Sequence, residues 1–264
     1  MKNDARGTAA HAFSKIPEVT FGFWIIKVAA TTLGETGGDW VTMSLKLGYL
    51  IGTAIFAGVF IGFVYAQIKE EKFQPFLYWA TIVATTTLGT TIADFADRSM
   101  GLGYPGGVTV VFGLLIASLA IWYWVEGSVS VQSVTTTRVE WFYWCTIMCS
   151  QTLGTALGDW MADTDRGGLG FGYEYGALVF GTGLVIVAAL YFWKKISRTL
   201  LFWAAFILTR PLGATLGDLL DKPVAEGGLH LNRLFASLIL LAFIVACLLV
   251  LPQRAARDGV GEAA

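Results

Sequence analysis

A single pattern occurs four times along this chain and constrains its fold more than any other feature. It consists of tryptophan, seven residues, threonine or proline, Leu-Gly, three residues, glycine or alanine, and aspartate. Each copy lies in an apolar stretch of about 20 residues, the length that a helix needs to cross a bilayer. A carboxylate within such a stretch is costly unless a partner or a function compensates for it. The copies run from Trp24 to Asp39, from Trp79 to Asp94, from Trp144 to Asp159 and from Trp203 to Asp218.

The composition indicates a membrane protein. Of the 264 residues, 55% are hydrophobic and 14% are charged, whereas soluble domains carry about 25% charged residues. The net charge of -1 excludes a nucleic-acid partner, because phosphate binding needs a basic surface. The composition therefore predicts the lipid bilayer as the surroundings of this chain.

Eight apolar segments are separated by charged or glycine-rich breaks. None alternates polar and apolar residues as the strands of a membrane barrel do, and helices satisfy their own backbone in lipid. We therefore expect an all-α polytopic membrane protein with eight transmembrane helices in four parallel two-helix repeats, with pseudo-symmetry about the membrane normal. The segments are 19–39, 47–68, 76–95, 104–125, 139–161, 174–193, 198–219 and 231–251. The predicted organisation is an N-terminal segment 1–18, a membrane domain 19–251 with repeats at 19–68, 76–125, 139–193 and 198–251, and a C-terminal tail 252–264.

Basic residues outside the segments predict the orientation. Eleven lysines and arginines lie on the side of the termini and five on the other side. Since positive loops stay in the cytoplasm, both termini are expected there, and the aspartates lie towards the outer end of each motif helix. The motif tryptophans are then interpreted as anchors at the cytoplasmic interface.

The small residues of the motif predict which helices lie inside. Gly34 and Gly38, and their counterparts in the other copies, are four residues apart and lie on one face of the helix. Helices in lipid associate by close approach at such faces. The first helix of each repeat is therefore expected inside the bundle and the second outside.

The aspartates admit two interpretations. In the first, each caps its helix by accepting backbone N–H bonds, and the protein is a non-transporting membrane scaffold or sensor. In the second, they converge on one cation site, because carboxylates at negatively polarised helix ends favour a positive partner. A threonine seven residues earlier lies on the same face in three copies. The predicted cation ligands are Asp39, Asp94, Asp159, Asp218, Glu35, Thr32, Thr87 and Thr152, with the four motif aspartates as the metal ligands; Asp97, Asp163, Asp165, Asp221 and Glu226 add charge to the same end.

Three charged residues break the fourfold pattern inside the predicted spans. Lys27 aligns with isoleucine or phenylalanine in the other copies, Arg210 with threonine or glutamine, and Glu35 with threonine or alanine. An ionised group at this depth needs a partner or water. A buried charge network is one interpretation. The other is that Lys27 and Arg210 neutralise the carboxylates when no cation is bound.

The ligand chemistry narrows the function. Oxygen ligands without histidine, cysteine or methionine suit hard or borderline cations. We therefore expect a cation transporter, for instance an exporter of divalent ions of the Mn, Mg or Ca type, with the ion as substrate. An ion channel is less favoured, because a passive pore has less need of the three symmetry-breaking charges. An intramembrane aspartyl protease is also less favoured, because two specific aspartates would suffice for it and four equivalent ones would be unexplained. Hydrolase, metalloprotease and nucleotide-binding motifs are absent from the sequence, so no enzymatic activity is expected.

The four copies, each followed by a second span, resemble a bacterial family of integral membrane proteins. That family is built from four tandem two-helix repeats with a characteristic tryptophan, and its function is catalogued as unknown. The resemblance covers about residues 19–251, with Trp24, Trp79, Trp144 and Trp203 at the tryptophan positions. It implies a multi-pass protein of the bacterial inner membrane and no particular chemistry. Pro211 in the fourth copy and Ala93 in the second depart from the pattern.

Overall fold

A computed structural model describes residues 15–131, 134, 136–193 and 196–256. These residues form eight α-helices and no β-strand, which confirms the all-α prediction. The helices are α1 (Phe21–Asp39), α2 (Gly48–Lys69), α3 (Pro75–Asp94), α4 (Gly103–Glu126), α5 (Thr137–Ala162), α6 (Tyr173–Tyr191), α7 (Arg198–Asp221) and α8 (Arg233–Val250). Short π-helices, η1 (Trp40–Ser44) and η2 (Phe95–Ser99), extend α1 and α3, and a 3-10 turn, η4 (Val224–Glu226), follows α7. Of the predicted tails, residues 1–14 and 257–264 lie outside the described residues, as do the basic residues Lys2, Arg6, Lys194, Lys195 and Arg257 that contributed to the predicted orientation.

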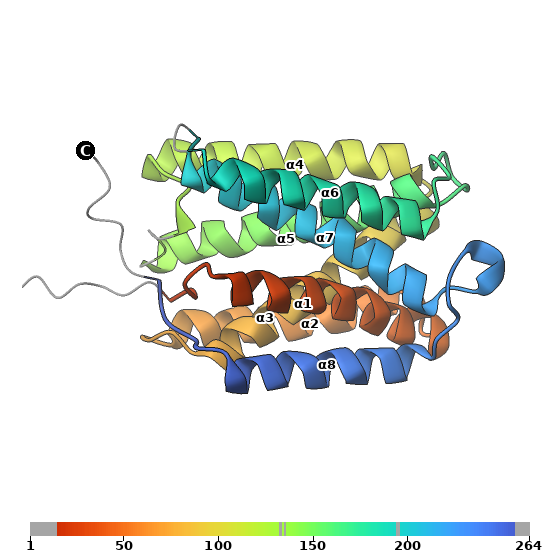
Figure 1. Cartoon of the computed structure of the whole chain (residues 1–264), viewed down its shortest axis with the longest axis horizontal. Helices are drawn as coiled ribbons and strands as arrows, with labels where there is room; N and C mark the ends of the chain where they lie inside the picture. Colours follow the sequence, from red (N-terminus) through yellow and green to blue (C-terminus); the bar gives the residue numbers. More distant parts are fainter. Residues whose placement is uncertain (1–14, 132–133, 135, 194–195, 257–264) are drawn as a thin grey trace, which may run out of the picture.

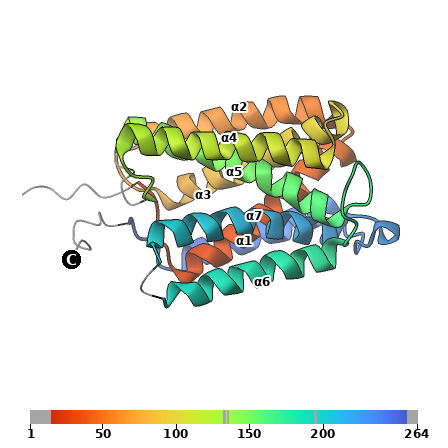
Figure 2. The ribbon, with the colours of Figure 1, turned by 90° about the horizontal axis from the view of Figure 1, so that it is seen from above.

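The helices form an inner and an outer layer. The inner helices α1, α3, α5 and α7 form a ring in which each packs against its two neighbours. The outer helices α2, α4, α6 and α8 lie around this ring, and all eight run along the long axis of the molecule (Figures 1 and 2). The predicted division into inner motif helices and outer second helices is confirmed.

Each outer helix packs mainly against the inner helix of the following repeat. Thus α2 lies on α3, α4 on α5 and α6 on α7, while α8 returns to α1 and closes the ring. Two of the connections between repeats are short, at residues 70–74 and 192–197, and short connections place consecutive helices side by side as antiparallel neighbours. The repeats therefore interlock, and no repeat is a separate folding unit.

Local sequence signals explain where the helices begin. The side-chain oxygens of Thr20, Thr136 and Ser197 each accept a hydrogen bond from a backbone N–H in the first turn of α1, α5 and α7, as N-cap residues do. Three outer helices begin at or directly after a glycine with positive φ, a conformation that costs glycine little. These glycines are Gly48, Gly103 and Gly172, with φ of 76°, 65° and 79°.

The outer helices carry the apolar surface of the molecule. Among the described residues, six helices are long and apolar enough to cross a membrane: the four outer helices, α3 with η2, and α7. In their most apolar stretches, 11% to 22% of the residues of the outer helices are buried, against 72% for α3 and 61% for α7. A soluble protein rarely exposes so much apolar side-chain surface.

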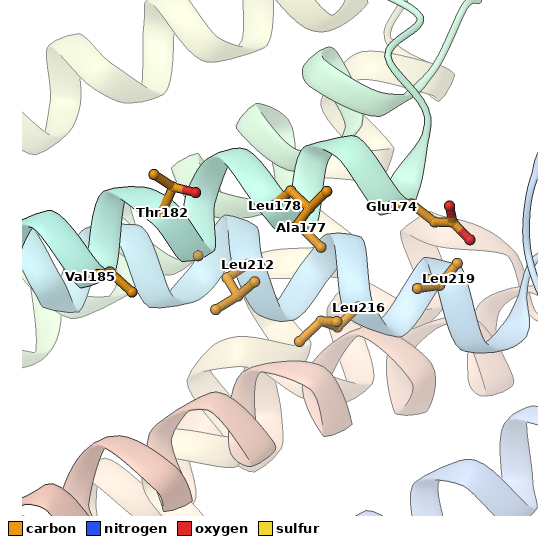
Figure 3. Close-up of a pocket in the computed structure, with 9 residues that line it drawn as sticks. Glu174, Ala177, Leu178, Thr182, Val185, Leu212, Leu216 and Leu219 are labelled. Atoms are coloured by element: carbon orange, nitrogen blue, oxygen red, sulfur yellow. The ribbon is translucent and has the colours of Figure 1, made fainter.

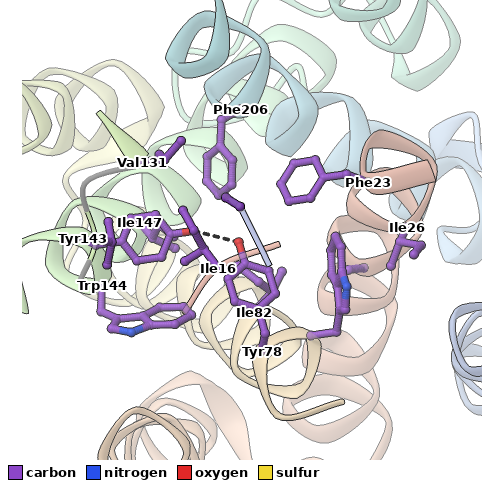
Figure 4. Close-up of a cluster of buried hydrophobic side chains, with 14 of the residues drawn as sticks. Ile16, Phe23, Ile26, Tyr78, Ile82, Val131, Tyr143, Trp144, Ile147 and Phe206 are labelled. Carbon is purple, nitrogen blue, oxygen red and sulfur yellow. Dashed lines mark hydrogen bonds between the residues drawn. The ribbon is translucent and has the colours of Figure 1, made fainter. Parts of the chain in front are cut away.

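Three of the four motif tryptophans are buried in the core, which contradicts their interpretation as interfacial anchors, and Trp24 is half-buried and packs against the same core. Trp79, Trp144 and Trp203 expose 5% or less of their surface and lie in the core, at the end of the bundle opposite to the motif aspartates. Around them, Tyr78 and Tyr143 share a hydrogen bond of 2.7 Å between their hydroxyls (Figure 4). Large rings fill the cross-section at this end, whereas small motif residues line the other end, so the tryptophans act in packing.

Candidate functional site

The side chains that face the centre of the inner ring form five layers of four, which we call the axial column. On each inner helix they follow one another at intervals of four residues, and none exposes more than 8% of its surface. From the aromatic end, the layers are Phe23, Tyr78, Tyr143, Phe202; Lys27, Ile82, Ile147, Phe206; Thr31, Thr86, Gln151, Arg210; Glu35, Thr90, Thr155, Ala214; and Asp39, Asp94, Asp159, Asp218. Equivalent repeat positions share a layer, so the four inner helices are parallel.

The motif glycines let the inner helices approach one another closely. A Cβ atom on Gly154 would overlap the Arg210 side chain, and one on Gly213 would overlap Thr31. Gly34 meets Thr86 and Gly89 meets Gln151 in the same way. Each contact joins a glycine to the third layer of the next inner helix around the ring, as expected for small-residue helix interfaces.

Arg210 closes the middle of the axial column. Its Nη2 donates to the Glu35 carboxylate at 2.8 Å and to the hydroxyls of Thr90 and Thr155, while Nη1 donates to the carbonyl of Thr31 at 3.3 Å. One guanidinium therefore binds groups from the other three inner helices. Both residues lie inside predicted spans, where a charge needs a partner, and the structure pairs Arg210 with Glu35 as a buried ion pair.

The four motif aspartates converge at the far end of the column, where two basic side chains bridge them in pairs. Lys222 Nζ lies 2.5 Å from Asp39 and 3.1 Å from Asp218. Burial alone would lower the pKa of Lys222, but Asp218 and Asp39 raise it well above its ordinary value, so the amine stays protonated.

Arg98 makes the corresponding bridge on the other side of the ring. Its Nε lies 2.7 Å from Asp94 and its Nη2 lies 3.4 Å from Asp159. Arg98 and Lys222 each follow a motif aspartate by four residues, a spacing that brings two side chains together on a helix. This spacing occurs only in the second and fourth copies, and it is the signal by which these partners could have been found in the sequence.

Asp221 and Arg233 complete what we call the acidic cluster. Arg233 lies 3.1 Å from Asp221 and 4.0 Å from Asp39. Carboxylate oxygens of Asp39, Asp218 and Asp221 lie within 4.8 Å of one another, close enough for one cation to contact all three. Oxygens of Asp39 and Asp221 remain without a hydrogen-bond partner among the described residues. The acidic cluster comprises Asp39, Asp94, Asp159, Asp218, Asp221, Arg98, Lys222 and Arg233.

The charges of the acidic cluster do not balance. Five carboxylates face three basic side chains, which leaves two formal negative charges in a buried place. A small pocket beside the cluster, lined by Ser44, Asp221, His230 and Arg233 among others, connects it to the outside. The arrangement has the ligand type, the charge and the access that a hard cation needs.

A comparison with known proteins places these repeats in a family. The segments 22–73, 77–128, 142–197 and 201–253 each match a family described as a repeat of unknown function, DUF347. The chain belongs to this family. No protein with a curated description and no solved structure matches the chain.

The boundaries of the DUF347 repeats agree with the predicted two-helix units. Each matched segment covers most of one inner helix and one outer helix, and it begins within the first two turns of the inner helix. The prediction of four tandem repeats is therefore confirmed. The repeat that the sequence defines is nevertheless not the packing unit, because each outer helix lies on the next repeat.

The structure does not bring the predicted threonines to the aspartates. The hydroxyls of Thr32, Thr87 and Thr152 each donate to a carbonyl four residues earlier in their own helix. The axial column follows the i, i+4 ridge of each helix, which is inclined to the helix axis. The predicted threonines stand seven residues before the aspartates, so they lie beside this ridge and not on it.

Lys27 is not near the aspartates that it was expected to neutralise. It is fully buried three layers away, with its Nζ over the ring of Phe206 at 4.2 Å from the ring centre. Of the additional carboxylates, Asp163 accepts a hydrogen bond of 2.6 Å from Tyr104 and two from the backbone N–H groups of Thr164 and Asp165. This capping role belongs to Asp163, whereas the partners that the structure gives the motif aspartates are basic side chains.

A larger groove lies outside the ring, between α6 and α7 (Figure 3). Leu212, Leu216 and Leu219 of α7 and Leu178 and Val185 of α6 line it, with Glu174 at one end. Its walls offer no cluster of polar groups, so it contributes nothing to the chemistry of the axial column.

Proposed function

We propose that this protein is a cation transporter of the cell membrane and that the acidic cluster binds the cation. The observation that carries the proposal is the convergence of Asp39, Asp218 and Asp221 at one end of the inner ring, within reach of a single ion. Buried carboxylates in a chain of this composition are expensive and mark ion pathways by default.

Membrane insertion is part of the proposal. The exposed apolar surface of the outer helices supports it, as do the six helices that meet the length and apolarity needed for a span. α1 and α5 carry too many polar residues to qualify by apolarity alone, but most of the polar side chains along these two helices are buried inside the bundle. We infer that all eight helices span the bilayer, with both termini in the cytoplasm of a bacterial cell.

The charge balance favours a divalent ion. With five carboxylates and three basic side chains in the acidic cluster, one divalent cation restores neutrality without the loss of a resident base. The ligand set of carboxylate oxygens suits Mg²⁺, Ca²⁺ or Mn²⁺.

Lys222 acts in this proposal as a tethered substitute for the cation. It occupies the place between Asp39 and Asp218. An incoming ion takes this place while the Lys222 ammonium moves aside within the acidic cluster, so its charge stays in the balance. For release to the other side of the membrane, the Arg210 and Glu35 pair that closes the column must open. The transport step is then a rearrangement of the inner helices about this pair.

The closed column also favours a second candidate, a membrane sensor that binds the cation without transporting it. Arg210 joins all four inner helices, which gives a passing ion no route unless they move. Cation binding without flux is the result that distinguishes the sensor from the transporter.

The first experiment measures thermal unfolding of the purified protein with Mn²⁺, Mg²⁺ or Ca²⁺. A ligand that binds only the folded state stabilises it, by about 2.7 kcal/mol at one hundred times its Kd. We expect one of these ions to raise the Tm of the wild type and to have little effect on Asp39→Asn/Asp218→Asn. The matched control is Asp163→Asn, whose carboxylate is bound to Tyr104 and to its own loop, and which keeps the response.

The second experiment measures flux of the same ion into proteoliposomes. Flux in the wild type that Asp39→Asn/Asp218→Asn abolishes supports transport, and stabilisation without flux supports the sensor. Lys222→Met is expected to bind the ion more tightly, because it removes the competing charge, and to be less stable without it. Unchanged stabilisation in the double aspartate variant would remove the acidic cluster from both functions.

A further inference from the structure

Lys27 is the one charged side chain of the axial column without a counter-charge. It is fully buried, and its Nζ has no hydrogen-bond partner and no ion pair among the described residues. The charged side chain of the next layer of the column is Arg210, which carries the same sign. Glu35 lies eight residues further along α1, about 12 Å at helical rise, and is bound by Arg210.

The ring of Phe206 does not compensate for the burial of Lys27. A cation over an aromatic face gains about 2 kcal/mol when it is desolvated. Removing an ion from water costs several kcal/mol even after the protein relaxes. The ring alone therefore does not hold an ammonium at Lys27: a charged Lys27 needs a bound partner, which the other side chains of its layer, Ile82 and Ile147, do not offer.

Further donors without partners lie in the adjoining layer of the column. Gln151 is fully buried, and its amide nitrogen and oxygen both lack a partner in the described chain. The Nε of Arg210 lacks one as well. Buried polar atoms without partners are rare and point to an unseen ligand or water. Here three of the four groups, on Lys27, Gln151 and Arg210, are donors, and two of the three side chains are cationic.

We propose that the axial column binds a small inorganic anion, such as chloride, between Lys27 and Gln151. The middle of the column holds two basic side chains, Lys27 and Arg210, against one carboxylate, Glu35, so one monovalent anion makes it neutral. Bulky buried side chains surround the place, which restricts the ligand to a few atoms. This site is three layers from the acidic cluster, and the inference does not depend on the proposed transport of cations.

The test compares thermal unfolding of the purified protein in sodium chloride, sodium bromide and sodium gluconate at equal ionic strength. The wild type is expected to unfold at least about 3 °C higher in chloride or bromide than in gluconate. Lys27→Met is expected to lose this difference and to be as stable in gluconate as the wild type is in chloride, because Arg210 and Glu35 then balance each other. Lys69→Met, at the end of α2, is the control that keeps the difference.

A crystal grown in bromide supplies the second readout. We expect an anomalous peak in contact with Lys27 Nζ and its weakening in Gln151→Leu, a variant that stays informative if Lys27→Met does not fold. Equal stability in all three salts, or bromide only at the protein surface, would overturn the proposal. Lys27 would then be a neutral amine or would be bound to water. Because gluconate carries the same cation, failure here does not affect the measurements on the acidic cluster.

Discussion

At the scale of the residue, the interior of this protein is defined by close contacts at glycine and by ion pairs that cross from helix to helix. The motif glycines of each inner helix lie directly against third- and fourth-layer side chains of the next inner helix. Arg210 is the clearest case, since its stem packs on Gly154 while its guanidinium binds Glu35. Both features can be tested by single substitutions.

Gly154→Ala is expected to destabilise the protein by about 1–3 kcal/mol, because the new methyl group overlaps the buried Arg210 stem and such overpacking costs that amount. The control is Gly62→Ala on α2, where a Cβ meets nothing within 4 Å. There the better helix propensity of alanine is expected to stabilise by about 0.5–1 kcal/mol. Unfolding in denaturant measures the stability of both variants. Equal effects of the two substitutions would contradict the close contact between Gly154 and Arg210.

Arg210→Met is expected to destabilise by about 3–5 kcal/mol, because it leaves the Glu35 carboxylate buried without its partner. Arg210→Met/Glu35→Gln removes the orphaned charge and is expected to recover part of the loss. The double-mutant cycle gives the coupling energy directly. Additive effects of the two substitutions would show that the pair is not formed.

At the scale of the element, the interlocked repeats are the main result. The outer helix of the fourth repeat lies on the first inner helix, where Ser237 of α8 and Thr36 of α1 share a hydrogen bond of 2.8 Å between their hydroxyls. No repeat precedes the first one, so α1 would lack an outer helix if α8 did not return to cover it. The chain thus needs all four repeats to complete one packing scheme.

Thr36→Cys/Ser237→Cys, with the three natural cysteines replaced, is expected to form a disulfide under mild oxidation. The two hydroxyls are in contact, and a disulfide needs Cβ atoms about 3.5–4.5 Å apart. Thr36→Cys/Ser118→Cys is the control, since Ser118 of α4 instead bonds with Thr146 of α5. The chain is cleaved between the two cysteines, and gel mobility then shows whether the two fragments stay joined by the disulfide. Equal cross-linking of the test pair and the control pair would contradict the packing of α8 on α1.

At the scale of the whole molecule, the two ends of the bundle differ in character. One end holds the acidic cluster. At the other end, residues near both termini pair with each other, with Pro17 opposite Ala255 and Glu18 N–H donating to Arg254 at 2.9 Å. Ile16 and Ala256 belong to the buried cluster that closes the column at this end, and Figure 4 shows Ile16 among its aromatic rings.

Reporter fusions at the N- and C-termini are expected to be active in the cytoplasm, and fusions within the 163–172 connection outside it. The pairing of Pro17 with Ala255 puts both ends of the described chain on one side of the bundle, and the excess of basic residues on that side predicts that it is cytoplasmic. Termini on opposite sides of the membrane would contradict the pairing of Pro17 with Ala255. If both termini were outside, the pairing would stand and only the prediction from the basic residues would be wrong.

The sequence was sufficient to predict the eight helices, the four repeats, the inner place of the motif helices and the common level of the aspartates along the bundle. Apolar length, glycine spacing and the recurrence of the motif are local properties of each helix, so they can be read without a neighbour. Only the tertiary structure shows that each outer helix lies on the next repeat, that three of the four motif tryptophans are buried, and that Lys222 and Arg98 reach an aspartate of a second helix. The helical period gives the direction of a side chain around its own helix. Its partner depends instead on which helix lies opposite and on the inclined ridge along which the two helices meet.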